Sequence, residues 1–176
     1  DGTNDYCDLG FINPAESAMT YMGWIKSTDT QGVLISALPS TGLSKYTRGG
    51  IVWNSGNWYL VMGNGSTHDS NSSNSASAFL DGDWHHVAVV IDGQDWTCYV
   101  DGSEDCTWTS SVSAGTAGSY PLSIGRWGSY TNAYHTDGKV DEVAFFTSAL
   151  SSSDITAIYN NSRSGSLSSY DPYGWW

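Results

Sequence analysis

The stretch from residue 126 to residue 137 gathers side chains that are typical of sugar-binding loops. It reads RWGSYTNAYHTD, so three large aromatic rings are mixed with amide, hydroxyl and charged groups. An aromatic face stacks on the apolar side of a pyranose, and nearby polar groups hydrogen-bond to its hydroxyls. We therefore expect this stretch to bind a glycan, with Trp127, Tyr130 and Tyr134 stacking and Arg126, Asn132 and Asp137 hydrogen-bonding. The alternative, that the rings pack in a core, stays open.

A second segment offers the same mixture on a smaller scale. Residues 53–59 read WNSGNWY, a predicted hairpin turn flanked by Trp53 and Trp58. These two rings have the same two interpretations: they contact a sugar, or they are cross-strand partners in the core. Trp24 and Trp84 are expected in the core.

Catalytic groups are less evident. A glycosidase needs two carboxyl groups about 5.5 Å apart on one face for retention. Asp141 and Glu142 are neighbours, so on a strand they face opposite ways, and Glu104 and Asp105 belong to a predicted hairpin. A lyase would need a Tyr or His base beside a cation, which only residues 126–135 offer. The sequence therefore predicts a protein that is not an enzyme, with hydrolase or lyase activity as the less favoured alternative.

The pair His85 and His86 resembles a metal-binding pair, but its context is a strand. Neighbouring residues of a strand point to opposite faces, so both imidazoles cannot bind one ion in regular geometry. We expect them to pack and to hydrogen-bond.

Cys98 and Cys106 flank a predicted hairpin whose three-residue loop, residues 101–103, would place them opposite each other. The pair spacing of about 4.5 Å is at the short end of disulfide geometry, so either a disulfide or two reduced thiols fits the sequence. A disulfide would imply an oxidising compartment. Cys7 has no evident partner.

The composition limits the class of protein. The chain has 176 residues, which favours one domain, and a formal charge of −12. Such acidity opposes binding to nucleic acid and to anionic lipid. It reflects either a solvated surface or carboxylates around a divalent cation. No run of 18 apolar residues is present, so no membrane insertion is predicted.

Short apolar runs closed by Asp-Gly and similar turns predict an all-β protein. One helix is expected from Ser151, because Asp154 follows at capping-box spacing and Ile155, Ile158 and Tyr159 share a face. Residues 63–77 are polar and are expected to form a surface loop. The expected strands are residues 5–9, 18–26, 32–37, 50–53, 58–62, 76–80, 84–91, 96–100, 106–109, 122–124 and 139–146.

Three blocks of sequence carry a family resemblance. They are DWHHVAVVIDG at residues 83–93, YVDG at residues 99–102 and GKVDEVAFF at residues 138–146. In this order they resemble the laminin G-like branch of the concanavalin A-like lectin and glucanase superfamily. The resemblance covers residues 1 to about 160 and implies a two-sheet antiparallel β-sandwich, a jelly roll, with one short C-terminal helix. We expect this domain to span residues 1–163, with residues 164–176 as a tail or linker.

The same resemblance implies a structural calcium ion. Several branches of the family hold one between an Asp on the late strand and oxygens of the first strand, and hard cations prefer such oxygen ligands. Here the late-strand residue is Asp141 and the first-strand donors are Asp1, Gly2, Asn4 and Asp5. A turn-capping role for Asp141 is the alternative.

These expectations combine into a carbohydrate-binding or adhesion module of a larger extracellular, cell-surface or virion-surface protein. Its partners would be a glycan or polysaccharide and neighbouring modules of the parent chain. The alternative is a structural or decoration module that contacts protein through the aromatic tail, Tyr170, Tyr173, Trp175 and Trp176.

Overall fold

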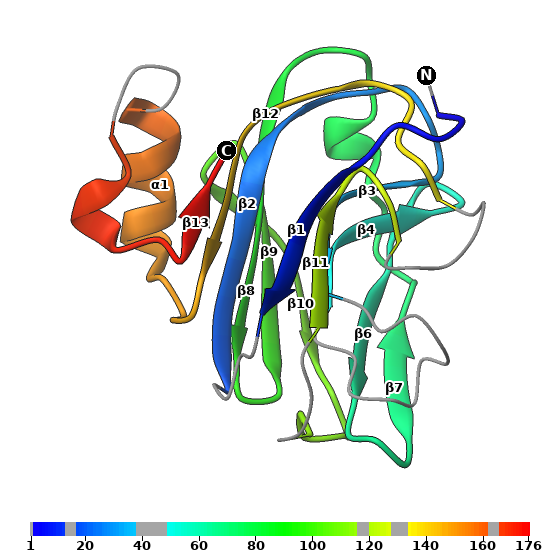
Figure 1. Cartoon of the computed structure of the whole chain (residues 1–176), viewed down its shortest axis with the longest axis vertical. Coiled ribbons are helices and arrows are strands. Elements are labelled where there is room, and N and C mark those ends of the chain that lie inside the picture. Colours follow the sequence, from blue (N-terminus) through cyan, green and yellow to red (C-terminus); the bar gives the residue numbers. More distant parts are fainter. Residues whose placement is uncertain (1, 13–16, 38–48, 116–119, 128–133, 162–165) are drawn as a thin grey trace.

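Two antiparallel sheets lie face to face in the computed structural model, which describes residues 2–12, 17–37, 49–115, 120–127, 134–161 and 166–176 (Figure 1). The five-stranded sheet contains, in spatial order, β1 (Cys7–Ile12), β11 (Tyr120–Ile124), β3 (Gly32–Ala37), β4 (Gly50–Asn54) and β5 (Asn57–Trp58). The six-stranded sheet contains β10 (Ser103–Thr109), β9 (Asp95–Val100), β8 (His85–Asp92), β2 (Ala18–Lys26), β12 (Lys139–Phe146) and β13 (Gly174–Trp175). A separate hairpin pairs β6 (Leu60–Gly63) with β7 (His68–Asn71). The predicted all-β jelly roll is confirmed.

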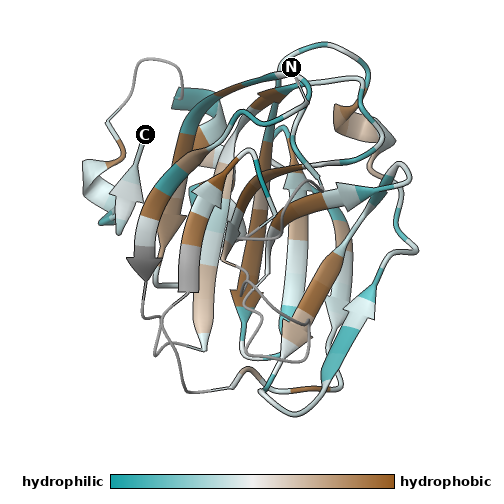
Figure 2. Cartoon of the chain, turned by 45° about the vertical axis from the view of Figure 1, so that its right-hand side comes forward, coloured by the Kyte–Doolittle hydropathy of each residue, from teal (hydrophilic) through white to brown (hydrophobic). Residues whose placement is uncertain are grey.

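The main core fills the space between the two sheets. Along β8, Val87, Val89 and Ile91 belong to this core, whereas Ala88 and Val90 belong to a second cluster on the outer face of the same sheet. This is the alternation of a strand, but both faces are covered, so the whole run is apolar. Hydrophobic residues accordingly follow the strands of both sheets, as the brown segments show (Figure 2). Each large side chain buried in this way stabilises the fold by roughly 1.5–3 kcal/mol.

The outer face of the six-stranded sheet is covered by α1 (Ser152–Asn161). The predicted capping box forms: the Asp154 N–H donates to Ser151 Oγ at 3.2 Å, and the Ser151 N–H donates to Asp154 Oδ2 at 3.1 Å. Ile155 and Ile158 are buried against the sheet. The predicted start and the predicted apolar face of this helix are confirmed.

Residues 166–176 also lie on this sheet. Leu167 joins the cluster under α1, a short turn of 3₁₀ helix, η2 (Ser168–Tyr170), follows, and β13 then pairs with β12. Val143 and Trp176 exchange two backbone hydrogen bonds of 2.8 Å. The sequence did not predict β13. The boundary expected at residue 163 stays a prediction.

The hairpin between β9 and β10 places Cys98 opposite Cys106, as predicted. The register arises differently from the expected three-residue loop, because the turn consists of Asp101 and Gly102, both with positive φ (50° and 75°). A bulge between Glu104 and Cys106 then restores the pairing.

Three segments differ from the prediction. The segment expected as a strand at residues 76–80 is a 3₁₀ turn, η1 (Ser77–Phe79). In a 3₁₀ helix residues three apart lie on the same side, and Ala76 and Phe79, which have this spacing, are both completely buried. The segment expected as a loop at residues 63–77 contains the strand β7, which pairs with β6. The side chains of β7 are polar, so the sequence pattern did not indicate a strand there. The strand expected at residues 58–62 is divided at Tyr59 into β5 and β6.

Candidate functional site

The loop that follows β11 begins at Arg126, which fastens it to the first strand. Arg126 Nη2 lies 3.3 Å from Asp8 Oδ2, and the guanidinium carbon lies 3.7 Å from the centre of the Tyr6 ring. A planar cation suits both contacts. The arrangement leaves only 14% of the Arg126 side chain exposed, so this residue positions the loop.

Trp127 is buried, with 6% of its surface exposed. It packs on Val33, Val52 and Val61 on the outer face of the five-stranded sheet. The rings of Tyr59 and Tyr134 lie 5.2 and 5.0 Å from its own ring centre. Trp127 therefore supports the partly exposed ring of Tyr134 and does not offer its own face to solvent. Tyr130 and Asn132, the other expected ligand residues of this loop, lie outside the described residues.

The end of the loop is attached to the sandwich at Thr136 and Asp137. The Thr136 hydroxyl accepts the Val33 N–H at 2.9 Å and donates to the Val33 carbonyl at 2.5 Å. The Asp137 carbonyl accepts a hydrogen bond of 2.6 Å from Ser27 Oγ, while the Asp137 side chain is exposed. This places Asp137, an expected sugar ligand, at the rim of the sandwich.

A polar hollow of about 600 Å³, called here the rim hollow, lies at this place. Its walls come from the loop after β2, the loop before β8 and the start of β12. Its lining residues are Lys26, Ser27, Thr28, Asp29, Gly82, Asp137, Gly138 and Lys139. Gly138 is required by a close approach, because a Cβ there would lie 2.5 Å from the Lys26 carbonyl oxygen. A second hollow of about 330 Å³ shares Gly138 and is lined by Asp5, Tyr6, Cys7, Ile124, Gly125, Thr136 and Val140.

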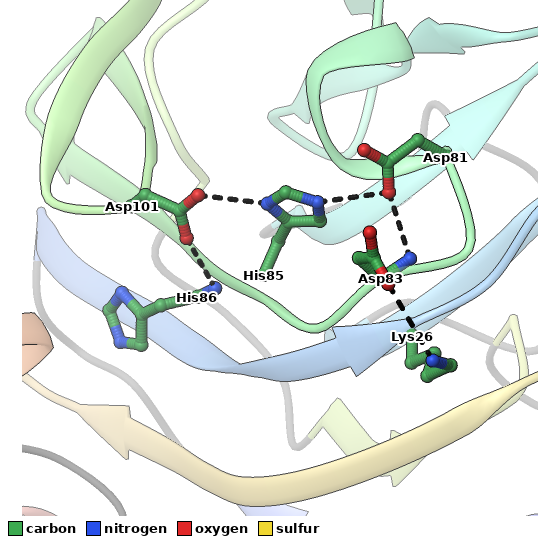
Figure 3. A network of polar contacts seen from close by, with 6 residues as sticks. All are labelled: Lys26, Asp81, Asp83, His85, His86 and Asp101. Carbon is green, nitrogen blue, oxygen red and sulfur yellow. Dashed lines mark hydrogen bonds and ion pairs between the residues drawn. The ribbon is translucent and has the colours of Figure 1, made fainter.

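A chain of polar contacts, the histidine clamp, holds the wall of the rim hollow on the side of β8 (Figure 3). His85 lies between two carboxylates: Nδ1 is 2.8 Å from Asp101 Oδ2 and Nε2 is 3.0 Å from Asp81 Oδ1. Burial alone would lower the pKa of His85, but the hydrogen bonds and charges of Asp101 and Asp81 outweigh it and raise this pKa. The Asp83 N–H donates to Asp81, and Asp83 lies 3.8 Å from Lys26 Nζ.

His86 points to the opposite face, as the strand pattern predicted. Its ring lies 5.6 Å from the Trp24 ring and 6.2 Å from the Tyr159 ring on α1. Burial lowers the pKa of His86 to about 4, so the ring is neutral at pH 7. Its Nδ1 is buried and has no hydrogen-bond partner among the described residues. The two imidazoles therefore lie on opposite faces of β8, one between two carboxylates and the other beside two aromatic rings.

The calcium ligands expected from the family are only partly assembled. Asp5 and Val140 line the same hollow, so the segment before β1 does lie beside the start of β12. However, Asp141 Oδ1 accepts the Glu142 N–H at 2.9 Å, and Gly2 lies against Asp137. Within the described ranges, no three His, Cys, Asp or Glu side chains are grouped to hold a metal ion. Asn4 is exposed, and Asp1 lies outside those ranges. The calcium site stays a prediction.

Cys98 and Cys106 are both buried and both free, so the expected disulfide is not formed in this structure. The two cysteines are register partners on β9 and β10, and burial raises the pKa of Cys98 well above its ordinary value. Of the second aromatic segment, Trp53 and Trp58 are directly opposite each other and completely buried, so their core interpretation holds. Cys7 is exposed.

Two stacked antiparallel sheets with a polar rim define a lectin-like jelly roll. A family model of the laminin G type, described as the concanavalin A-like lectin/glucanases superfamily, matches residues 1–156. The chain therefore belongs to this superfamily, which confirms the resemblance carried by its three sequence blocks.

Several solved structures have the same fold, including the following three. Mouse laminin alpha1 chain, domains LG4-5, has 16% identity and a TM-score of 0.58, covering 78% of this chain and 38% of that one. The structure described as NanB with Optactamide has 17% identity and a TM-score of 0.65, and the match covers 89% of this chain and 26% of that one. The binding domain of botulinum neurotoxin DC in complex with SialylT has 15% identity and a TM-score of 0.57, covering 84% and 36%.

At these identities the similarity shows the fold, and this chain spans well under half of each of those longer chains. A search of curated proteins finds no match. Among the described residues, no helix is long and apolar enough to cross a membrane.

Proposed function

We propose that this chain is a carbohydrate-binding module of a larger extracellular, cell-surface or virion-surface protein, and that it catalyses no reaction. The observation that supports this most is the partly exposed ring of Tyr134, which rests on the buried Trp127 and lies three residues from the rim hollow. A ring held in this way keeps one face for a pyranose without losing conformational entropy on binding. The superfamily and the neurotoxin binding domain in complex with SialylT add support.

In this proposal the aromatic and polar roles are divided along one loop. Tyr134 stacks on the sugar, and Asp137 accepts hydrogen bonds from its hydroxyls. Tyr130 and Asn132, which lie between Trp127 and Tyr134 in the sequence, are proposed as further sugar contacts. Trp127 and Arg126 are largely buried, so in this proposal they hold the loop in place and do not contact the sugar. A calcium ion held by Asp141 and the first segment would stabilise the rim.

A glycan array and affinity electrophoresis with soluble polysaccharides test the proposal on the intact protein. We expect Tyr134→Ala to abolish retardation by any polysaccharide that the native chain binds. Tyr173→Ala is the matched control, because Tyr173 is 58% exposed in the tail and its ring lies 5.8 Å from that of Phe145, at the end of β12 away from the rim hollow. Absence of binding across a broad panel, or equal loss in both variants, would refute the proposal. Release of reducing ends from the same polysaccharides would refute its non-catalytic part.

A second function, protein contact through the tail, is favoured by one observation. Tyr173, Trp175 and Trp176 are 58%, 44% and 46% exposed, and β13 is an edge strand whose outer side carries no further strand among the described residues. Exposed aromatic side chains at a sheet edge suit a neighbouring module of the parent chain. Light scattering of the native chain and of Trp175→Ser tests it: an unchanged mass at high concentration would argue against self-association through this edge.

A further inference from the structure

The rim hollow has the properties of a preformed ligand site. Three separate segments build it, and hydrogen bonds join them. The Gly82 N–H donates to the Ser27 carbonyl at 3.1 Å, Ser27 Oγ donates to the Asp137 carbonyl at 2.6 Å, and Trp53 Nε1 donates to the Asp29 carbonyl at 2.8 Å. The volume of about 600 Å³ lies within the range of small-molecule sites. Ordering of the walls therefore precedes any binding.

The lining offers charged groups that the rest of the described chain does not use. The side chains of Lys139 and Asp137 make no hydrogen bond or ion pair with any residue in the described ranges. Within the described ranges, the side-chain carboxylate of Asp29 accepts only the Gln31 N–H, through Oδ1 at 3.2 Å. Ammonium groups donate and carboxylates accept hydrogen bonds, so both kinds of partner for a hydroxyl are present. A polyhydroxylated ligand can satisfy them together.

The charge of the lining indicates which sugars fit. Lys26 and Lys139 are register partners between β2 and β12, and Asp29 and Asp137 balance them. Lys26 also has Asp83 at 3.8 Å. The hollow is thus neutral or slightly negative, on a chain whose formal charge is −12. The net negative charge of the chain, together with the carboxylates of Asp29, Asp83 and Asp137 at or beside the hollow, disfavours uronates, sulfated glycans and other polyanions. Carboxylates in the wall instead suit neutral hydroxyl groups, which donate to them without a charge conflict.

No aromatic ring lines the hollow, and Tyr134 lies three residues before Asp137, a separation that an extended chain spans in at most about 10 Å. Stacking and hydrogen bonding are therefore separated in space. From these observations we propose that the rim hollow binds one unit of a neutral glycan, with Asp137 and Asp29 accepting from adjacent hydroxyls and Lys139 donating to a third oxygen. This inference rests on the proposed function and adds the place and the sugar class. Tyr134 then contacts the next unit of the chain.

Calorimetric titration of the intact protein tests the inference with D-glucose, D-galactose and D-mannose, alone and as oligosaccharides, and with glucuronate and galacturonate as acidic counterparts. We expect a neutral sugar to bind and the acidic sugars to bind at least tenfold more weakly. Asp137→Asn should weaken binding about tenfold or more, since hydrogen bonds to charged groups are the strong ones. The hydrogen bond from Ser27 Oγ to the residue 137 carbonyl should remain in this variant, because it involves the backbone and not the substituted side chain.

Asp92→Asn is the matched control, because Asp92 is exposed at the opposite end of β8. Tyr134→Ala should lose oligosaccharide affinity but keep the single unit in the hollow. Stronger binding of acidic sugars, or a neutral sugar whose affinity Asp137→Asn and Lys139→Gln leave unchanged, overturns the inference while the proposed function stands. Absence of binding to every glycan overturns both.

Discussion

The hydroxyl of Thr136 takes the place of a neighbouring strand beside Val33. Past the end of β11, no further ladder residue satisfies Val33, and the single hydroxyl both accepts its N–H at 2.9 Å and donates to its carbonyl at 2.5 Å. The loop after β11 is thereby tied to the middle of the five-stranded sheet. This bond keeps Trp127 on the sheet and Asp137 at the rim.

Replacing Thr136 by Val should therefore destabilise the protein. The two side chains are similar in shape, but the variant leaves a buried N–H and a buried carbonyl without partners, which costs about 2 kcal/mol or more. The denaturation midpoint in urea measures the loss. Thr109→Val is the control: its hydroxyl also makes a hydrogen bond, to Asp95 at 2.6 Å, but in an exposed position. We expect that change to stay within about 0.5 kcal/mol. Equal effects of the two substitutions would contradict the role assigned to Thr136.

Much of the fold could be predicted because its signals are local. Ser151 and Asp154 are three residues apart, and an Asp-Gly pair lies between two apolar strands, so the helix start and the pairing of Cys98 with Cys106 could be predicted, although the turn has two residues where three were expected. The site depends on contacts between distant segments. The sequence places Trp127 in a loop between two strands. Its burial depends on contacts with distant residues, namely Val33, Val52 and Val61 of the sheet and hairpin and the ring of Tyr134. The rim hollow joins residues 26–29, 82 and 137–139, which share no spacing that a sequence pattern could reveal.

The histidine clamp should make stability depend on pH above about pH 6.5, the ordinary pKa of a histidine. The pKa of His85 in the folded protein is raised above 6.5 by Asp101 and Asp81 against the opposing effect of burial. The contribution of the clamp to the free energy of unfolding is therefore complete below pH 6.5 and is lost as the pH rises through the raised pKa. Urea midpoints of the native chain and of His85→Gln, measured from pH 6 to pH 9, should converge as the pH rises. A difference that stays constant over this range would show that the charge of His85 does not matter.

His86 should produce the opposite dependence on the acid side. Its folded-state pKa of about 4 lies below the unfolded value of 6.5, so below pH 6.5 the unfolded chain binds a proton that the folded chain does not. Stability should fall by about 1.5 kcal/mol between pH 6.5 and pH 5. His86→Phe, which keeps an aromatic ring between Trp24 and Tyr159, should remove this part of the slope. An identical slope in the variant would place the titration elsewhere.

Cys98 and Cys106 should form a disulfide during oxidative refolding more readily than in the native protein. They are register partners, so their strands already hold them together, but burial raises the pKa of Cys98 and disfavours the thiolate that exchange requires. Refolding with oxidised glutathione should give a bridged protein that is about 2 Da lighter than the reduced protein. The folded chain under the same conditions should stay reduced for much longer, for about the time that it takes to unfold spontaneously. The closed loop is short, so the bond should add about 2.5 kcal/mol in the chain-entropy model. Cys7→Ser removes the exposed competing thiol and serves as the background. Rapid oxidation of the folded Cys7→Ser protein would show that the pair is accessible, and a bridged product less stable than the reduced one would show that the opposed strands cannot accommodate the bond.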